Sequence, residues 1–104
     1  MKIDSTFNGR AIDVAAGDDL EIALEEKATA GFRWTLVSGG EPACSLVGEA
    51  LESAQHPPGA AAIHRWRFRA GAAGTGTIRL ACGRRWEADA GRVFELGVRV
   101  KTPQ

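Results

Sequence analysis

The chain has 104 residues, of which 44% are hydrophobic, a size that suits one domain with a core of its own. Thirteen basic and thirteen acidic side chains leave a formal net charge of zero, so no overall field attracts nucleic acid or an anionic membrane surface. Thirteen glycines, four prolines and the lack of a long apolar run indicate many turns and argue against a membrane span.

Two features of the sequence bear on the compartment. Met1 to Thr6 contains no apolar stretch behind its single basic residue, so we expect no secretory signal peptide in this sequence. A cytosolic protein and a trimmed mature form both fit such a start. Cys44 and Cys82 lack a CxxC spacing, so small buried hydrophobic residues are the favoured interpretation, and a disulfide in an oxidising compartment is the alternative.

Period-two alternation predicts two strands before residue 27. Residues 10–14 place Ile12 and Val14 on one side, and residues 16–19 follow as a turn. Residues 20–25 place aliphatic side chains on one face and glutamates on the other, which is typical of a half-buried strand. The aliphatic residues are Leu20, Ile22 and Leu24.

The middle of the chain predicts three further strands. Residues 32–36 and 63–70 each carry aromatic side chains on one face, whereas residues 43–51 fit either a short strand or a turn of helix, of which we favour the strand. Prolines and glycine make residues 55–62 an exposed loop. The predicted inward residues are Phe32, Trp34 and Leu36, followed by His64, Trp66 and Phe68.

The last third of the chain predicts two strands around residues 75–82 and 94–101. Their inward residues are Ile78, Leu80 and Cys82, followed by Phe94, Leu96, Val98 and Val100. No segment shows a sustained helical period. About seven to eight short strands at regular spacing predict an all-β fold, a two-layer antiparallel β-sandwich formed by a single domain, residues 1–104.

The sequence does not assemble a catalytic centre, so we expect no enzyme. His56 lies beside two prolines and His64 alternates with core aromatics, so solvated or structural roles are favoured. A Cys82–His64 pair would need neighbouring strands and an accessible thiol, but both side chains are predicted to point into the core, where a thiol is inert. Metal-binding, P-loop and GxGxxG motifs do not occur, so we expect no metal ion and no cofactor.

A row of arginines invites a phosphate-binding interpretation. Its members are Arg65, Arg67, Arg69 and Arg79. A solvated sheet face is the favoured alternative, because acidic residues elsewhere balance the charge and no exposed aromatics interleave for base stacking. We therefore expect no nucleic-acid partner.

Two loops carry residues suited to contact with a partner. Residues 27–34 combine a threonine in a small-residue loop, a glycine that permits positive φ, and an aromatic-x-aromatic pair that opens a strand. Residues 83–87 place Trp86 after two arginines, out of register with the inward residues of the preceding strand. An exposed tryptophan at that position favours a binding contact, whereas Trp34 and Trp66 fall in register with the core.

With these loops the chain resembles the chagasin-type (I42-like) inhibitors of papain-like cysteine peptidases, small immunoglobulin-like sandwiches that present three loops at one end. The family motifs are an Asn-Pro-Thr-Thr-Gly-aromatic loop followed by x-Trp, a Gly-x-Gly-Gly loop and an Arg-Pro-Trp loop. They recur in the same order at residues 27–34, 59–62 and 84–87, and the resemblance covers nearly the whole chain.

The motifs depart from the family pattern in each loop. Lys27, Ala28 and Ala30 replace Asn, Pro and Thr, Ala61 and Ala62 replace two glycines, and Arg85 replaces a proline. Losing the proline at Ala28 raises the ordering cost of the loop by about 0.4–1 kcal/mol. Losing the glycines removes backbone freedom that a close approach requires.

The resemblance implies a monomeric, reversible inhibitor that covers the catalytic cleft of a papain-like cysteine peptidase without a covalent bond. The loop with Thr29 would enter the cleft, while the loops with Gly59 and Trp86 would clamp either side. The implied peptidase-binding residues are Lys27, Ala28, Thr29, Ala30, Gly31, Phe32, Gly59, Ala60, Ala61, Arg84, Arg85 and Trp86. The alternative is a non-inhibitory immunoglobulin-like binding module, motivated by the alanine-rich second loop and Arg85.

Overall fold

The computed structural model describes residues 1–26, 32–52, 62–84 and 92–101. These residues form strands and one short 3-10 helix, and no helix among them has the length and apolar character needed to cross a bilayer. The elements are β1 (Lys2–Ile3), η1 (Ser5–Phe7), β2 (Arg10–Ala15), β3 (Asp19–Glu26), β4 (Phe32–Gly39), β5 (Cys44–Glu52), β6 (Ala62–Ala70), β7 (Gly74–Arg84) and β8 (Arg92–Lys101).

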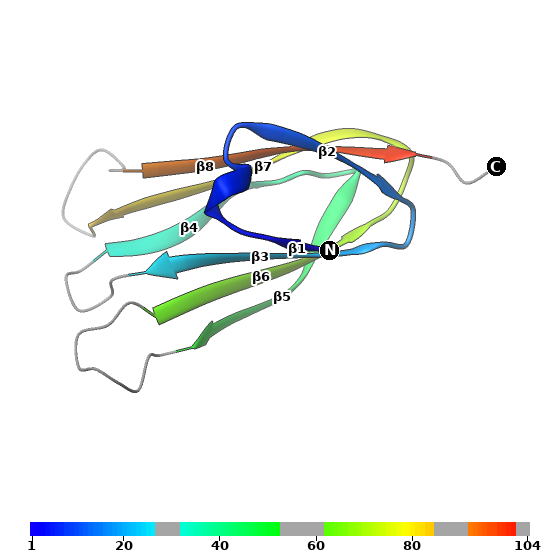
Figure 1. Ribbon diagram of the computed structural model, residues 1–104. Coiled ribbons are helices and arrows are strands. Elements are labelled where there is room, and N and C mark those ends of the chain that lie inside the picture. Colours follow the sequence, from blue (N-terminus) through cyan, green and yellow to red (C-terminus); the bar gives the residue numbers. More distant parts are fainter. Residues whose placement is uncertain (27–31, 53–61, 85–91, 102–104) are drawn as a thin grey trace.

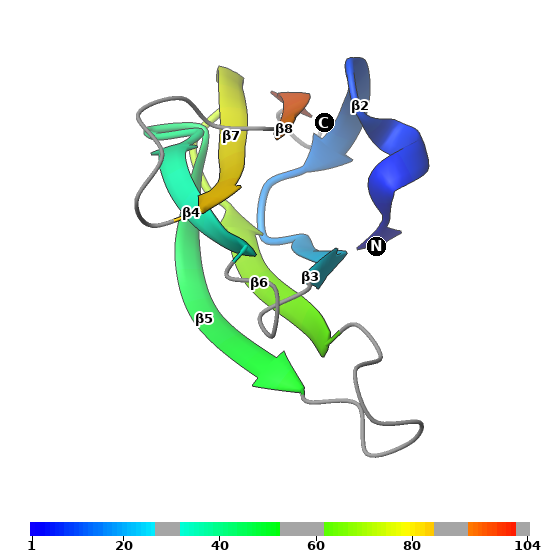
Figure 2. The same cartoon turned by 90° about the vertical axis from the view of Figure 1, so that its left-hand side faces the viewer.

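The strands form two four-stranded sheets, in the orders β1-β3-β6-β5 and β2-β8-β7-β4. Figure 1 shows the sheets as two layers seen from the side, and Figure 2 shows them along the strands. The predicted all-β sandwich is confirmed, with one difference in strand direction. The N-terminal segment supplies one edge strand to each sheet, and both of these strands run parallel to their neighbours, β1 to β3 and β2 to β8. The remaining pairings are antiparallel.

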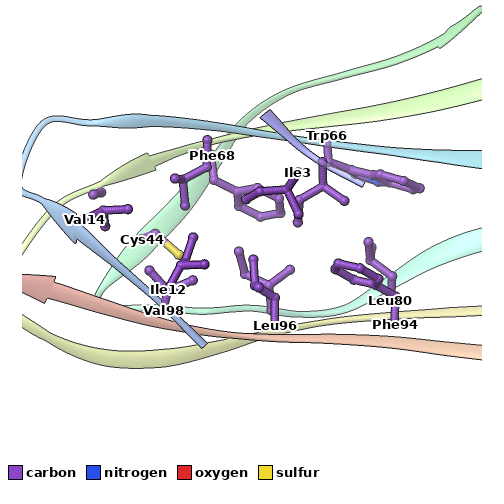
Figure 3. Packing of buried hydrophobic residues seen from close by; sticks show 14 of the residues in the cluster. Ile3, Ile12, Val14, Cys44, Trp66, Phe68, Leu80, Phe94, Leu96 and Val98 are labelled. Atoms are coloured by element: carbon purple, nitrogen blue, oxygen red, sulfur yellow. The ribbon is translucent and has the colours of Figure 1, made fainter. Parts of the chain in front are cut away.

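The core lies between the sheets and consists of the inward residues of each alternation. Trp66 and Phe68 point toward Leu80, Leu96 and Val98 of the opposite sheet (Figure 3). All five are at most 2% exposed, and each fully buried side chain of this kind contributes about 1.5–3 kcal/mol of transfer free energy. The inward sets predicted from the sequence are therefore confirmed where the structure describes their side chains, with Leu36 only partly buried against the core.

The ambiguous segment 43–51 is a strand, as favoured from the sequence: β5 spans Cys44–Glu52. It forms one edge of its sheet, as β4 does in the other, and both edge strands are interrupted. The pairing of β5 with β6 shifts between Leu46 and Gly48, and that of β4 with β7 shifts between Leu36 and Ser38. A bulge twists an edge strand and so discourages pairing with another chain.

A tight turn closes the end of the sandwich at which β4 finishes and β7 begins. Gly40 has φ +79°, a conformation that favours glycine, and its carbonyl accepts the backbone N–H of Cys44 at 3.1 Å. A Cβ atom on Gly76 would overlap that same carbonyl group. Both glycines are thus required by the backbone itself.

Candidate functional site

The ends of six strands meet at one end of the sandwich. In the sheet β1-β3-β6-β5, Glu26 at the end of β3 pairs with Ala62, and Glu52 at the end of β5 pairs with Ile63. In the other sheet, Arg84 at the end of β7 pairs with the first residue of β4. The strand β8 begins at the same end, since Arg92 pairs with Cys82.

These six strand ends lie together on the left of Figure 1. Three connections, residues 27–31, 53–61 and 85–91, therefore start and finish at the same end of the molecule. They hold most of the three loops that the sequence singled out, but the described strands take residues 32–34, Ala62 and Arg84. The prediction of an exposed loop over residues 55–62 is wrong at Ala62, which is buried as the first residue of β6 because it pairs with Glu26 of β3.

Phe32 and Arg84 are the predicted contact residues that lie in described strands. Phe32 opens β4, Arg84 ends β7, and the two residues are paired across the ladder. The other predicted contact residues lie outside the described residues, as does His56. They are Lys27, Ala28, Thr29, Ala30, Gly31, Gly59, Ala60, Ala61, Arg85 and Trp86.

A buried carboxylate lies at the end of β3, next to the connection formed by residues 27–31. Glu26 is only 2% exposed, and its Oε1 accepts the backbone N–H of Trp34 at 2.6 Å. This bond joins the last residue of β3 to the start of β4, and so ties the strands on either side of residues 27–31. A hydrogen bond to a charged group stabilises by about 1.5–3 kcal/mol, more than one between neutral groups.

His64 lies between two carboxylates. Its Nδ1 is 3.1 Å from Oε1 of Glu26, and its Nε2 is 2.7 Å from Oε2 of Glu49. The imidazole ring also stacks on Trp66, with ring centroids 3.9 Å apart and 16° between the planes. His64 thereby connects β3, β5 and β6, which agrees with the structural role expected from the sequence.

The side chain of Trp34 is held by contacts with two other strands. Its Nε1 donates to the carbonyl of Glu25 at 2.9 Å, and the guanidinium carbon of Arg92 lies 5.6 Å from the ring centroid. A cation over an aromatic face is attracted by the ring. Trp34 therefore links β3, β4 and β8 directly beneath the strand ends, as well as belonging to the core that the sequence predicted.

A cleft of about 430 Å³ opens between β4 and β5, next to Glu26 and Trp34. It is lined by Glu26, Arg33, Trp34, Thr35, Glu49, Ala50, Leu51 and His64. Its polar lining combines carboxylates, a guanidinium and an imidazole. Within the described ranges, however, no group of three or more His, Cys, Asp or Glu side chains is arranged to hold a metal ion.

Sequence reasoning missed Glu26 as an inward residue, although a signal for it was present. Glu26 has the same parity as Leu20, Ile22 and Leu24, so the alternation of β3 already directs it inward. A glutamate at an inward position is rarely buried without a partner. The inward histidine of the adjacent strand, His64, was available as that partner.

The Cys82–His64 pairing considered from the sequence does not form. β6 and β7 belong to different sheets, so the two residues are not on neighbouring strands. Cys44 and Cys82 are free, buried thiols. Burial raises the pKa of both, Glu41 raising that of Cys44 further, while Arg92 lowers and Glu26 raises that of Cys82. A protonated, enclosed thiol is a poor nucleophile.

The predicted arginine row is divided between the outer faces of the two sheets, because Arg79 lies on β7 and the other three arginines lie on β6. Three of the four arginines pair with carboxylates of the described residues. Arg65 reaches Glu21 at 3.5 Å and Glu52 at 3.2 Å. Arg69 lies 3.2 Å from Asp19, and Arg79 lies 4.0 Å from a neighbouring glutamate of β8. These pairs fit the solvated sheet face that the sequence favoured. Each stabilises by at most about 1 kcal/mol because the groups are partly exposed.

The chain was compared with protein families, curated proteins and solved structures. The model of the Chagasin family peptidase inhibitor I42 matches residues 13–98. Comparison with curated proteins finds no match.

Solved structures share the fold over nearly the whole chain. The cysteine protease inhibitor EhICP2 from Entamoeba histolytica matches with a TM-score of 0.84 and 20% identity, covering 96% of this chain and 94% of that one. Amebosin matches with a TM-score of 0.79 and 28% identity, covering 97% of each chain. PbICP-C, solved in complex with falcipain-2, matches with a TM-score of 0.68 and 14% identity, covering 99% of this chain and 90% of that one.

Proposed function

The chain belongs to the chagasin family of peptidase inhibitors, and from this premise we propose that it inhibits papain-like cysteine peptidases by covering the catalytic cleft with three loops. The loop of residues 27–31 would enter the cleft, and the loops that contain Gly59 and Trp86 would hold its two sides. The peptidase is the expected partner, and one inhibitor monomer is expected to bind one enzyme.

The observation that carries this proposal is the convergence of strand ends. Phe32 pairs with Arg84, Glu26 pairs with Ala62, and Glu52 pairs with the neighbouring Ile63, all at the same end of the sandwich. A surface built from three connections at one end suits a cleft, because one rigid body can then enter it and contact both walls. The structure of PbICP-C in complex with falcipain-2 is consistent with such a partner.

Rigidity at the base of the loops favours binding. The cluster around Glu26 and Trp34 fixes the strands that flank residues 27–31, so less conformational entropy is lost when a complex forms. The neutral Thr29 and Gly31 suit the centre of an interface. Lys27 and Arg85 belong at its rim, since an unpaired buried charge is costly.

Titration of a papain-like peptidase with increasing inhibitor tests the proposal. We expect loss of peptidase activity that reaches completion near one equivalent at enzyme concentrations above the dissociation constant. Recovery of activity on dilution would confirm that the block is reversible and non-covalent. Full activity of several papain-type enzymes at micromolar inhibitor would contradict the proposal.

The second candidate is a non-inhibitory binding module of the same fold. The replacements in the loops favour it, in particular Arg85 in place of proline and alanines in the second loop. Capture of a defined non-peptidase partner that still binds the Trp86→Ala variant, together with absent inhibition, would support this candidate.

A further inference from the structure

The contacts of His64 set a proton requirement. A neutral imidazole carries one N–H and can donate to a single acceptor, whereas the imidazolium donates from both nitrogens. The two nitrogens of His64 face carboxylate oxygens at 3.1 and 2.7 Å. Both contacts are hydrogen bonds together only when the cluster formed by Glu26, His64 and Glu49 holds one proton more than a neutral histidine with two carboxylates.

Burial makes this requirement costly to violate. The side chain of Glu26 is 2% exposed and that of His64 is 9% exposed, while Glu49 is about half exposed. Without the extra proton, a nitrogen lone pair would face a carboxylate oxygen where water has little access. An unsatisfied polar contact in such surroundings costs about 1–3 kcal/mol.

The other charged and titratable groups around the cluster come from three strands. From β4, Arg33 lines the same cleft. From β7, Cys82 is close enough to Glu26 for the carboxylate to raise the pKa of its thiol, and from β8, Arg92 lowers that pKa and lies over the ring of Trp34. Trp66 covers the ring of His64. His64 thus has carboxylates at both nitrogens and an apolar ring on one face.

The cluster is coupled to the binding end through a single atom. Oε1 of Glu26 contacts His64 and also accepts the N–H of Trp34. Glu26 is the last residue of β3, and Trp34 is the third residue of β4. Any displacement of the Glu26 carboxylate therefore changes the bond that sets the distance between these strands.

We propose that the cluster is a proton-dependent clamp, in which Glu26 and His64 are positioning residues for the first loop and inhibition strengthens when His64 is an imidazolium. This inference rests on the proposed function. In the protonated state both carboxylates are held, Glu26 is fixed, and the end of β3 keeps one distance from the start of β4. In the unprotonated state the single ring proton stays on Nε2, at the shorter contact with Glu49, and the Glu26 carboxylate turns away from Nδ1.

The Glu49→Gln variant separates the clamp from simple packing. A glutamine can accept from the imidazolium or donate to the neutral ring, so it contacts Nε2 of His64 in both states. Glu49 is half exposed, so the variant is expected to fold. Glu52→Gln is the matched control, because it removes the same charge from the same strand at a residue that contacts Arg65 instead of His64.

Inhibition constants of the wild type and both variants are measured against one papain-like peptidase at pH 5.5 and 8.0, which spans the range in which histidines ordinarily change charge. Dividing the inhibition constant of each variant by that of the wild type at the same pH cancels the pH response of the enzyme. We expect the Glu49→Gln ratio to fall roughly fivefold or more from pH 5.5 to 8.0, and the Glu52→Gln ratio to stay constant. An equal Glu49→Gln ratio at both pH values overturns the clamp.

A readout without a peptidase distinguishes this failure from failure of the proposed function. Nitrogen-15 shifts of the His64 ring report its protonation, and the exchange protection factor of the Trp34 amide reports the bond to Glu26. We expect that protection factor to drop on deprotonation in the wild type and to stay constant in Glu49→Gln. A constant protection factor in the wild type rejects the clamp, even if the protein inhibits. A wild type that does not inhibit but shows the drop rejects only the proposed function.

Discussion

Phe32 and Arg84 face each other across the last rung of the ladder between β4 and β7, although 52 positions separate them in the sequence. Residues 27–31 therefore end beside the point at which residues 85–91 begin. Because the two residues are partners in the ladder, the strand ends next to the first and third loops lie side by side. A change of position of one strand end is transmitted directly to the other.

This adjacency of strand ends predicts that single substitutions in either loop weaken inhibition without loss of stability. We expect Trp86→Ala to raise the inhibition constant by about 30-fold or more, the scale of an interface hot spot. Thr29→Arg should weaken inhibition further, because it would bring an unpaired charge into the cleft. Inhibition constants and thermal denaturation midpoints are measured for both variants.

Ala72→Arg provides the control for Thr29→Arg, because Ala72 is exposed in the turn between β6 and β7 at the opposite end of the sandwich. It should inhibit like the wild type. Equal weakening by Ala72→Arg and Thr29→Arg would show that binding does not occur at the predicted end.

The turn between β4 and β5 predicts a strict requirement for glycine at position 76. In Gly76→Ala the new Cβ would overlap the carbonyl of Gly40, which is held in place by the N–H of Cys44. We expect a loss of about 1–3 kcal/mol in the free energy of unfolding. Urea denaturation measures it.

Gly48→Ala is the matched control for this substitution. A Cβ at Gly48 would meet only the Cβ of Arg67, at an ordinary contact distance of 3.9 Å. Its free energy of unfolding should change by less than about 0.5 kcal/mol. A Gly76→Ala protein as stable as Gly48→Ala would contradict the close approach of the two backbones.

The two buried thiols predict that the stability of the fold depends on pH. Burial raises the pKa of Cys44 and Cys82 above the ordinary thiol value of 9.0. The folded protein therefore keeps its thiol protons to a higher pH than the unfolded chain, and stability should fall as the pH rises above about 9. Unfolding at pH 8, 9 and 10 measures the trend.

Reaction with a thiol reagent gives an independent check at pH 8. Native protein should react slowly, and denatured, unreduced protein should show both thiols at once, because Cys44 and Cys82 are free. Fewer reactive thiols in denaturant would indicate a disulfide and contradict the structure.

Much of the fold could be predicted because alternation fixes the face of each side chain. Leu20, Ile22, Leu80 and Leu96 are inward in the sequence pattern and fully buried in the structure. Alternation does not state which strand pairs with which. The sequence therefore left β6 and β7 as possible neighbours, and it gave no indication that Lys2–Ile3 pairs in parallel with β3.

The site was predictable in part for a related reason. Phe32 and Arg84 could be assigned to loop boundaries by their motifs, but the interaction of Glu26 with His64 and Glu49 depends on three strands that are distant in sequence. A polar residue at an inward position signals that a partner exists without identifying it. Only the sheet order supplies the identity of that partner.

The bulge in β5 predicts that this edge of the sheet is protected against pairing with a second copy of the chain. Val47 is the extra residue between Leu46, which pairs with Phe68, and Gly48, which pairs with Arg67. Deleting Val47 would leave every other pair of the ladder in place and straighten an exposed edge. A regular edge strand is a template for pairing with another chain.

We therefore expect the Val47 deletion to fold and to form dimers or larger species in a concentration-dependent manner. We expect the wild type and Val47→Ala, both of which keep the bulge, to be monomeric. Light scattering coupled to size-exclusion chromatography, run across a hundredfold range of concentration, distinguishes them. If the deletion variant folds and stays monomeric throughout, the bulge does not protect this edge. Exposed side chains along β5, such as Leu51 at 46% exposed, would then be the next features to test for protection of this edge.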